Sequence, residues 1–297
     1  MKDNAASSIR LDAWLRRRYP GLSRQHIIEA IEEGLVRREG GGRLRKGDRI
    51  ADPPDCTGLD RHLARILSGN PALDVPVLEE TDDIIVVDKP AGMPGHPVHL
   101  LDIDTVCHWA LARYPQIRAW CTAGQPTLTP HRLDTGTSGV LLVAKTAAAY
   151  RHWRGLFSGG KVEKQYLAWC WGVPAADRWR VDIGLVHDTS DRRRMVPAGG
   201  GRAQRVLPAE SHVSVEKRLD DRFLCRVTCR TGVMHQVRAH LRVSGHPLLG
   251  DDLYDDAFAA RPASFPHVLL RAVRLAAPGF TAAAPETPFA ERFPGPL

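Results

Sequence analysis

The sequence has no apolar run long enough to cross a membrane. A transmembrane helix needs roughly 20 apolar residues, whereas the longest apolar runs, such as Ile84 to Val87 and Val140 to Ala144, are far shorter. The N-terminal stretch MKDNAASSIR has no apolar core of the kind that a signal peptide carries. We therefore expect a soluble, cytoplasmic protein with no membrane partner.

Cysteine is also scarce, with six residues scattered between Cys56 and Cys229. This density is too low for a secreted disulfide scaffold, and we expect reduced thiols. Cys225 and Cys229 could suggest a metal pair, but alternation in RFLCRVTC puts both on one face of a strand, with no second ligand pair at metal spacing. We expect buried core cysteines and no metal.

The overall composition is that of a globular protein, with 43% hydrophobic and 25% charged residues. This composition excludes disorder, collagen and coiled coil, and 297 residues suffice for one large or two unequal domains. The formal net charge of +7 predicts a surface that attracts polyanions in a salt-dependent way.

The first clear pattern near the N-terminus predicts two short helices separated by Pro20 and Gly21. It lies in the segment IRLDAWLRRRYPGLSRQHIIEAIEEGLV. Ser23 is expected to cap the second helix, and Gly34 to end it. Residues 8–52 hold 11 Lys or Arg against 7 Asp or Glu, although such a charge run is also typical of a merely solvated face.

Residues 8–52 resemble the small αL-type RNA-binding module of a small-subunit ribosomal protein and of many RNA-modifying enzymes. The matching stretches are RLDAWL, SRQHIIEAIEEGLV and KGDRI, while VRREGGG departs from the usual Asn-Gly turn. The resemblance implies contact with structured RNA through basic residues of the first helix and hairpin. The candidates are Arg10, Arg16, Arg17, Arg18, Arg24, Arg37, Arg38, Arg43 and Arg45.

Residues 53–76 are rich in proline and predict a linker with about one helical turn. A second domain, 77–297, is then expected, with strands at IIVVD, VLLVAKT, YLAWCWG and RFLCRVTC and a helix capped by Asp104. This mixed order of elements favours an α+β fold with a largely antiparallel sheet over a doubly wound one.

The stretch TPHRLDTGTSGVLLVAKT places His131, Arg132 and Asp134 on a small-residue loop before a buried strand. Such a loop could hold a carboxylate against a ligand. An Asp before Thr-Gly also commonly just forms a turn, and local chemistry alone does not separate the two interpretations.

HRLDTGTSGVLLVAK is similar to the signature of RluA-type pseudouridine synthases, and the resemblance extends over roughly residues 77–280. It implies a pseudouridine synthase catalytic domain with a mixed, largely antiparallel sheet flanked by helices. It also implies that Asp134 is the catalytic aspartate. The substrate-binding candidates that accompany it are His131, Arg132, Thr137, Lys164, His235 and Gln236.

Two further stretches match the same family. In KVEKQYLAWCWGV, the resemblance makes Tyr166 the active-site tyrosine that packs on the target base, although a lone strand tyrosine is usually core. In TGVMHQVRAHLRVSGHPLLGDDLY, it makes Arg238 the basic partner of Asp134, on a helical stripe that would otherwise be solvated surface. Val233-Met234 departs from the family's more frequent Arg-Thr.

The implied reaction detaches uracil from the ribose of a uridine, rotates it and rejoins it through carbon, without a cofactor. The target base must first be flipped out of its stack. Asp134 could attack the anomeric carbon, add to the pyrimidine ring or remove the proton from the second sugar carbon, and the sequence leaves all three open. We expect an RNA partner, ribosomal RNA or alternatively transfer RNA, and no obligate protein partner.

Two other classes of function compete with this prediction. A noncatalytic RNA-binding or ribosome-assembly factor could keep the same shell, but the joint presence of Asp134, Tyr166 and Arg238 argues against it. A hydrolase is disfavoured because GTSGV lacks glycine at position 140 for a nucleophile elbow, and because HQVRAH lacks the pattern of a zinc helix.

Overall fold

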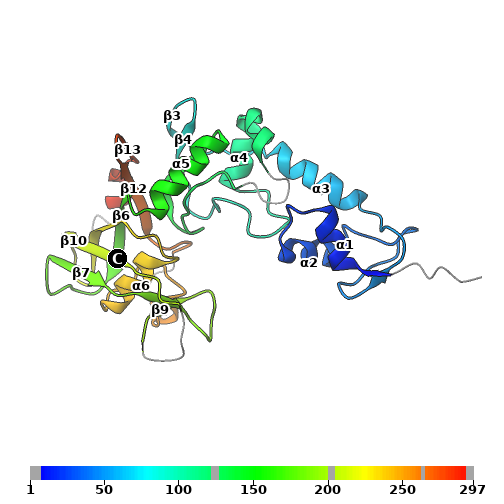
Figure 1. The fold of residues 1–297 in the computed structure, drawn as a ribbon. Coiled ribbons are helices and arrows are strands. Elements are labelled where there is room, and N and C mark those ends of the chain that lie inside the picture. The colour runs from blue at the N-terminus through cyan, green and yellow to red at the C-terminus, as the bar shows by residue number, and fades with distance from the viewer. Residues whose placement is uncertain (1–7, 122–126, 200–204, 262–264, 292–297) are drawn as a thin grey trace, which may run out of the picture. The chain divides into compact units, whose positions relative to one another are not determined.

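The computed structural model describes residues 8–121, 127–199, 205–261 and 265–291. The chain forms two compact units. The first comprises the residues up to 74 together with 94–129 and 145–147, and the second comprises 75–93, 130–144 and the residues from 148 onward. Figure 1 labels the elements of both units.

The first unit is mainly helical. Its elements are β1 (Ile9–Arg10), α1 (Leu11–Arg18), α2 (Arg24–Glu32), β2 (Arg49–Ile50), α3 (Thr57–Ser68), α4 (Val106–Arg113) and the 3-10 helix η1 (Pro115–Trp120). Strands β1 and β2 pair antiparallel, so that the two ends of the segment 9–50 are joined.

The two predicted N-terminal helices are confirmed, together with the signals that delimit the second. Ser23 is the N-cap of α2, and its side chain accepts a hydrogen bond from the backbone N–H of His26 at 3.1 Å. Gly34 follows the helix with φ +68°, which glycine adopts readily.

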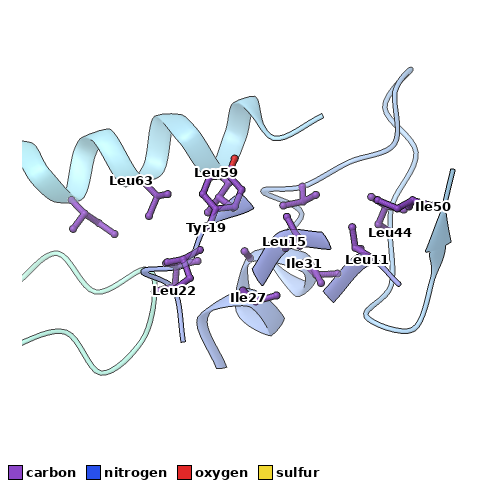
Figure 2. Packing of buried hydrophobic residues seen from close by; sticks show 14 residues of the cluster. Leu11, Leu15, Tyr19, Leu22, Ile27, Ile31, Leu44, Ile50, Leu59 and Leu63 are labelled. Carbon is purple, nitrogen blue, oxygen red and sulfur yellow. The ribbon is translucent and has the colours of Figure 1, made fainter. Parts of the chain in front are cut away.

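The structure corrects the expectation that residues 53–76 form a linker with about one helical turn. This segment contains the 12-residue helix α3. Leu59, Leu63 and Ile66 are buried along one side of α3, and they share a core with Leu11 and Leu15 of α1. Figure 2 shows Leu59 and Leu63 on the side of α3 that faces Tyr19 and Leu15, with Ile27 and Ile31 of α2 in the same cluster. The prolines before residue 57 and after 70 flank the helix rather than interrupt it, so local composition concealed its apolar face.

The predicted helix near residue 104 is also present, but its cap differs from the prediction. Thr105 is the N-cap of α4, and its hydroxyl accepts from the backbone N–H of His108. Asp104 accepts a hydrogen bond from the side chain of Asn70 at 2.7 Å instead. Thr105 adopts the extended backbone that a cap requires, one residue after the predicted position.

The second unit contains the large sheet. Its elements are β3 (Val77–Glu80), β4 (Ile84–Lys89), β5 (Ser138–Ala144), α5 (Ala147–Ser158), β6 (Glu163–Trp171), β7 (Arg178–Asp182), β8 (Leu185–His187), β9 (Met195–Pro197), β10 (Glu210–Arg218), β11 (Arg222–Cys229), α6 (Gln236–Val243), η2 (Phe258–Ala260), β12 (Leu270–Ala277), β13 (Phe280–Ala283) and α7 (Thr287–Ala290).

Within the described residues the large sheet has nine strands in the order β3-β4-β5-β12-β6-β11-β10-β7, with β13 beside β12. The pair β5–β12 is parallel, and the other pairs of this sheet are antiparallel. The predicted α+β fold with a mixed, largely antiparallel sheet flanked by helices is therefore confirmed.

Alternation along β6 separates two apolar layers. Tyr166, Ala168 and Cys170 point to the side covered by Val237 and Leu241 of α6. The intervening residues, Leu167, Trp169 and Trp171, pack in a second cluster with Phe289 of α7. Period-two burial of this kind fixes the register of a central strand.

The predicted strand face of β11 is confirmed as well. Phe223, Cys225, Val227 and Cys229 are all buried in the cluster beneath α6, so that both cysteines are core residues with free thiols. In the part of the chain that the structure describes, no helix is long and apolar enough to span a membrane.

Gly139, the second residue of β5, lies at a close approach of two backbones. It has φ +108° and pairs with Ala272 of β12, and a Cβ atom there would lie 1.9 Å from the carbonyl oxygen of Ala272. Only glycine allows this approach of two backbones. The loop that carries Asp134 is thereby fixed at its end, where it enters β5.

Candidate active site

A cavity of about 660 Å³ opens in the second unit, beside the end of the loop that precedes β5. Asp134, Tyr166 and Arg238, which come from a loop, a central strand and a helix, all line it. The cavity thus brings together three side chains that are far apart in the sequence.

The backbone around Asp134 is held by hydrogen bonds from several sides. The N–H of Thr137 donates to the carbonyl of Asp134 at 3.0 Å and closes a turn. The carbonyl of the next residue, Thr135, accepts from the N–H of Gly92 at 2.8 Å and from Nζ of Lys89 at 3.1 Å. The turn 89–93 therefore supports the loop directly behind the carboxylate.

Arg238 is buried, with 8% exposure, and it binds two carboxylates. Its Nε and Nη2 donate to the two oxygens of Asp251 at 2.8 and 2.7 Å, while its Nη1 lies 3.5 Å from Oδ2 of Asp134. Burial acts against the charge of Arg238, but the hydrogen bonds to Asp251 and the charges of Asp251 and Asp134 outweigh it and raise its pKa. A fixed cation therefore faces Asp134.

His235 approaches the other oxygen of the same carboxylate. Its Nε2 lies 3.8 Å from Oδ1 of Asp134, and its Nδ1 lies 3.1 Å from the hydroxyl of Tyr254. Burial lowers the pKa of His235, and the charge of Asp134 acts in the opposite direction. The Asp134 side chain itself is 27% exposed and can reach a ligand in the cavity.

Tyr166 forms part of the cavity wall from β6, between Val227 of β11 and Ala272 of β12. Burial raises the pKa of its phenol well above the ordinary value, with further contributions from Cys229 and Asp134, so that the hydroxyl stays neutral. No hydrogen bond from this hydroxyl to a described residue contributes to the shift. An aromatic face with a neutral hydroxyl is suited to a planar, polar base.

A comparison with protein families matches residues 83–242 to the model of the RNA pseudouridylate synthases. The match includes the loop of Asp134, the strand of Tyr166 and most of α6. The chain belongs to this family.

Individual relatives agree with this assignment. An uncharacterized RNA pseudouridine synthase of Synechocystis is 31% identical over 83% of this chain and 74% of its own length. The ribosomal large subunit pseudouridine synthase D of Zymomonas mobilis is 30% identical over 82% of this chain and 76% of its own length. The human RNA pseudouridylate synthase domain containing 1 protein has the same fold, with a TM-score of 0.61 at 23% identity over 74% of this chain and 86% of its own length.

The synthase is therefore an isomerase that acts on RNA, and the other predicted site residues can be located around its cavity. Arg132 is exposed, lies two residues before Asp134 and forms no ion pair with another described residue. Thr137 is buried, and its hydroxyl has no hydrogen-bond partner among the described residues. Both residues lie within the cavity lining.

Three of the predicted substrate-binding side chains bind the synthase itself. Nε2 of His131 accepts from the N–H of Leu142 at 3.0 Å, and burial lowers the pKa of His131 to about 3, with the charge of Lys164 adding to the effect. Nζ of Lys164 donates to the carbonyl of Thr231 at 2.5 Å. Gln236 donates to the carbonyl of Glu210 at 2.9 Å. These residues line the cavity and also brace its walls.

Val233 and Met234, the departure from the family pattern, form an apolar part of the lining. They pack against a cluster that includes Leu185, Met195 and Tyr254. Met234 lies before the first residue of α6, which begins at Gln236. Apolar side chains at this position favour contact with a base or ribose over contact with a phosphate.

The nine predicted RNA-binding arginines lie in the first unit, and all nine are exposed. Arg10 pairs with Asp12 at 3.0 Å, and Arg38 pairs with Asp48 at 3.1 Å. Arg16 and Arg17 form no ion pair with any described residue, which leaves their charges available to a polyanion.

Lys89, Asp251 and Tyr254 support the site from outside the cavity lining, and the sequence alone indicates no such role for them. The one signal in the sequence is that Lys89 ends the apolar strand IIVVDK, and the structure shows its side chain fully buried. Asp251 and Tyr254 lie in GDDLY, which matches the family motif but gives no local indication that the two residues contact Arg238 and His235.

Proposed function

We propose that Asp134 is the catalytic carboxylate of this synthase, with Arg238 as its orienting cation and Tyr166 as the support for the flipped uracil. The observation that carries the proposal is the convergence of these three side chains on one cavity, with Nη1 of Arg238 3.5 Å from the carboxylate. Arg238 is held in place by Asp251, so its position does not depend on the substrate.

The cavity matches what each possible reaction of Asp134 requires. Attack on the anomeric carbon, addition to the ring and removal of the proton from the second sugar carbon all need a charged carboxylate shielded from bulk water. A cavity of about 660 Å³ accommodates a flipped nucleotide together with part of a neighbour. Recognition of an unstacked base is typical of sequence-specific RNA binding in loops and bulges.

The proposed substrate is a uridine in large-subunit ribosomal RNA, with transfer RNA as the alternative. Relatives from Zymomonas mobilis and Haemophilus influenzae bear the name ribosomal large subunit pseudouridine synthase, at 30% and 28% identity. The basic surface of the first unit supports a large, folded RNA, because nonspecific phosphate contacts increase with the size of the RNA.

Replacing Asp134 with asparagine is expected to abolish pseudouridine formation while RNA binding stays within about threefold of the wild type. Asparagine keeps the shape of the side chain but can neither act as a nucleophile nor accept a proton. The measurement is a pseudouridine map of ribosomal and transfer RNA from cells that lack the synthase, complemented with either form.

The matched control is Asp177→Asn, which alters an aspartate with 83% side-chain exposure paired to Arg218. It should restore the same positions as the wild type. Positions restored by Asp134→Asn would refute the catalytic assignment, and positions restored only in transfer RNA would refute the ribosomal target but not the catalytic role.

We further propose that Arg16, Arg17 and Arg18 contact RNA phosphates. Replacing all three with glutamine should weaken binding to ribosomal RNA about tenfold or more at 0.1–0.2 M salt. The slope of the logarithm of the binding constant against the logarithm of the salt concentration should become less steep by about two to three. The three side chains are exposed at the end of α1, so thermal unfolding should not change. The arginine-to-lysine triple variant keeps the charge and should bind like the wild type, and equal salt slopes for all forms would contradict the proposal.

A further inference from the structure

The backbone of His235 is unusual. It is the only non-glycine residue with positive φ among the described residues, at φ 54°, and it forms the N-cap of α6 without a side-chain capping bond. This left-handed conformation is unfavourable for a residue with a side chain, such as histidine. Because the side chain does not repay that cost by capping the helix, its position calls for another explanation.

The hydrogen bonds at Tyr254 restrict where the imidazole proton of His235 can be. The backbone N–H of Met195 donates to the Tyr254 oxygen at 2.7 Å, so this oxygen already serves as an acceptor in a buried site. The phenolic hydrogen is then available for Nδ1 of His235 at 3.1 Å. If Nδ1 accepts that hydrogen, a neutral His235 carries its own proton on Nε2.

Charge favours the same tautomer. Nε2 faces Oδ1 of Asp134 at 3.8 Å, and a bare lone pair in this position would oppose the carboxylate. When His235 is protonated, both ring nitrogens carry hydrogen. An N–H at Nε2 therefore faces Asp134 in either charge state of the ring.

The other charged groups around the ring come from each element packed against it. Arg238 of α6 and Arg132 of the Asp134 loop disfavour a positive ring, whereas Asp134 and Asp251 favour it. The rings of Tyr254 and His235 are in a T-shaped arrangement, with their centroids 5.6 Å apart. The Cζ atom of Arg238 lies over the Tyr254 ring, 5.1 Å from its centroid. Tyr254 thus contacts both the His235 ring and Arg238.

We propose that His235 is a positioning residue for Asp134, with Tyr254 fixing its tautomer so that Nε2–H is directed at Oδ1 while Arg238 holds Oδ2. The two donors lie on different oxygens of one carboxylate, at 3.8 and 3.5 Å. Such contacts shorten when a substrate closes the site. The inference rests on the proposed catalytic role of Asp134.

The test compares two amides at position 235. Asparagine tolerates the left-handed backbone and places its amide near the Nδ1 position, but it has no donor where Nε2 lies. Glutamine is one methylene longer and can place its amide N–H near the position of Nε2. The substrate is unmodified large-subunit ribosomal RNA transcribed in vitro. His235→Asn should lower kcat about tenfold or more, with KM within about twofold of the wild type. The logarithm of kcat for His235→Gln should lie at least halfway back from that of His235→Asn to that of the wild type.

A second variant tests the effect of the His235 tautomer while the His235 ring is kept. Tyr254→Phe keeps the aromatic packing and removes the hydroxyl. Nitrogen NMR of the wild type should show neutral His235 protonated at Nε2, and the variant should show a mixture of tautomers. The kcat ratio of wild type to Tyr254→Phe should then increase as pH rises through the titration of His235, because the imidazolium has Nε2–H with or without Tyr254.

Tyr19→Phe is the control, because it also removes a tyrosine hydroxyl hydrogen bond, to Asp60 at 2.7 Å in the first unit, and should leave both readouts unchanged. A wild-type His235 protonated at Nδ1, or kcat of His235→Asn within twofold of the wild type, would overturn the inference. Asp134→Asn is assayed in parallel: an active Asp134→Asn would refute the proposed function, whereas an inactive one beside a fully active His235→Asn refutes only the positioning role.

Discussion

Replacing Asp251 with alanine should destabilise the synthase by about 3–5 kcal/mol and remove most of its activity. Asp251 is fully buried and accepts two hydrogen bonds from Arg238 and further ones from the backbone N–H groups of Leu253 and Tyr254. Its loss leaves a buried guanidinium with only a distant partner, Asp134. Chemical denaturation and single-turnover pseudouridine formation measure the two effects.

Activity should fall because the free guanidinium is expected to turn toward Asp134 and pair with it directly. The carboxylate would then be held by its cation instead of meeting the substrate, and a misplacement of about 1 Å can cost about 100-fold in rate. In the double variant Arg238→Met with Asp251→Leu, both charges are gone, so much of the stability should return while activity stays absent.

Asp255 provides the matched control. It is also buried and accepts two hydrogen bonds from one arginine, Arg261, at 2.8 and 3.1 Å, but neither residue lines the cavity. Asp255→Ala should therefore cost stability without lowering the single-turnover rate. An Asp251→Ala variant with normal activity would show that Arg238 is positioned without its buried partner.

Replacing Lys89 with methionine should cost about 3–5 kcal/mol of stability at pH 8 and lower kcat by about 100-fold. The side chain is fully buried, and Nζ donates to the carbonyls of Pro90, Met93 and Thr135 at 2.9, 2.7 and 3.1 Å. Methionine fills the same space but leaves all three carbonyls without this donor. The loop of Asp134 would lose a support one residue from the carboxylate.

The effect of Lys89 on stability should depend on pH. Burial lowers the pKa of Lys89 to about 7, with the charge of Asp134 opposing the shift, whereas an unfolded lysine has a pKa of about 10.4. Between these values the unfolded chain binds more protons than the folded one, so the free energy of unfolding of the wild type rises with pH. The stability difference between wild type and Lys89→Met should therefore widen from pH 7 to pH 10.

Lys161→Met is the control for both measurements, because Lys161 is exposed after α5 and its side chain forms no hydrogen bond or ion pair with the described residues. It should change neither the unfolding free energy nor kcat. A difference between wild type and Lys89→Met that stays constant over pH 7–10 would mean that the three carbonyls keep the ammonium charged throughout.

Local patterns predicted a large part of this structure. The helix limits at Ser23 and Gly34, the alternation of β11 and the α+β class are visible in the sequence because each depends on residues a few positions apart. Helix α3 was missed although Leu59, Leu63 and Ile66 lie at helical spacing, because the prolines on both sides of it are typical of a linker. The polar stripe of α6 suggested solvent, yet Arg238 is buried because Asp251 neutralises it.

By itself, the sequence determined the family of the synthase, the class of fold and the identity of Asp134, Tyr166 and Arg238 as candidates, since these follow from contiguous motifs. Only the tertiary structure decided how the candidates are held. Lys89 supports the Asp134 loop across 46 positions, and Asp251 holds Arg238 across 13. A hydrogen bond between such residues leaves no periodic trace in the sequence, because its geometry exists only after the sheet, the loop and α6 have packed together.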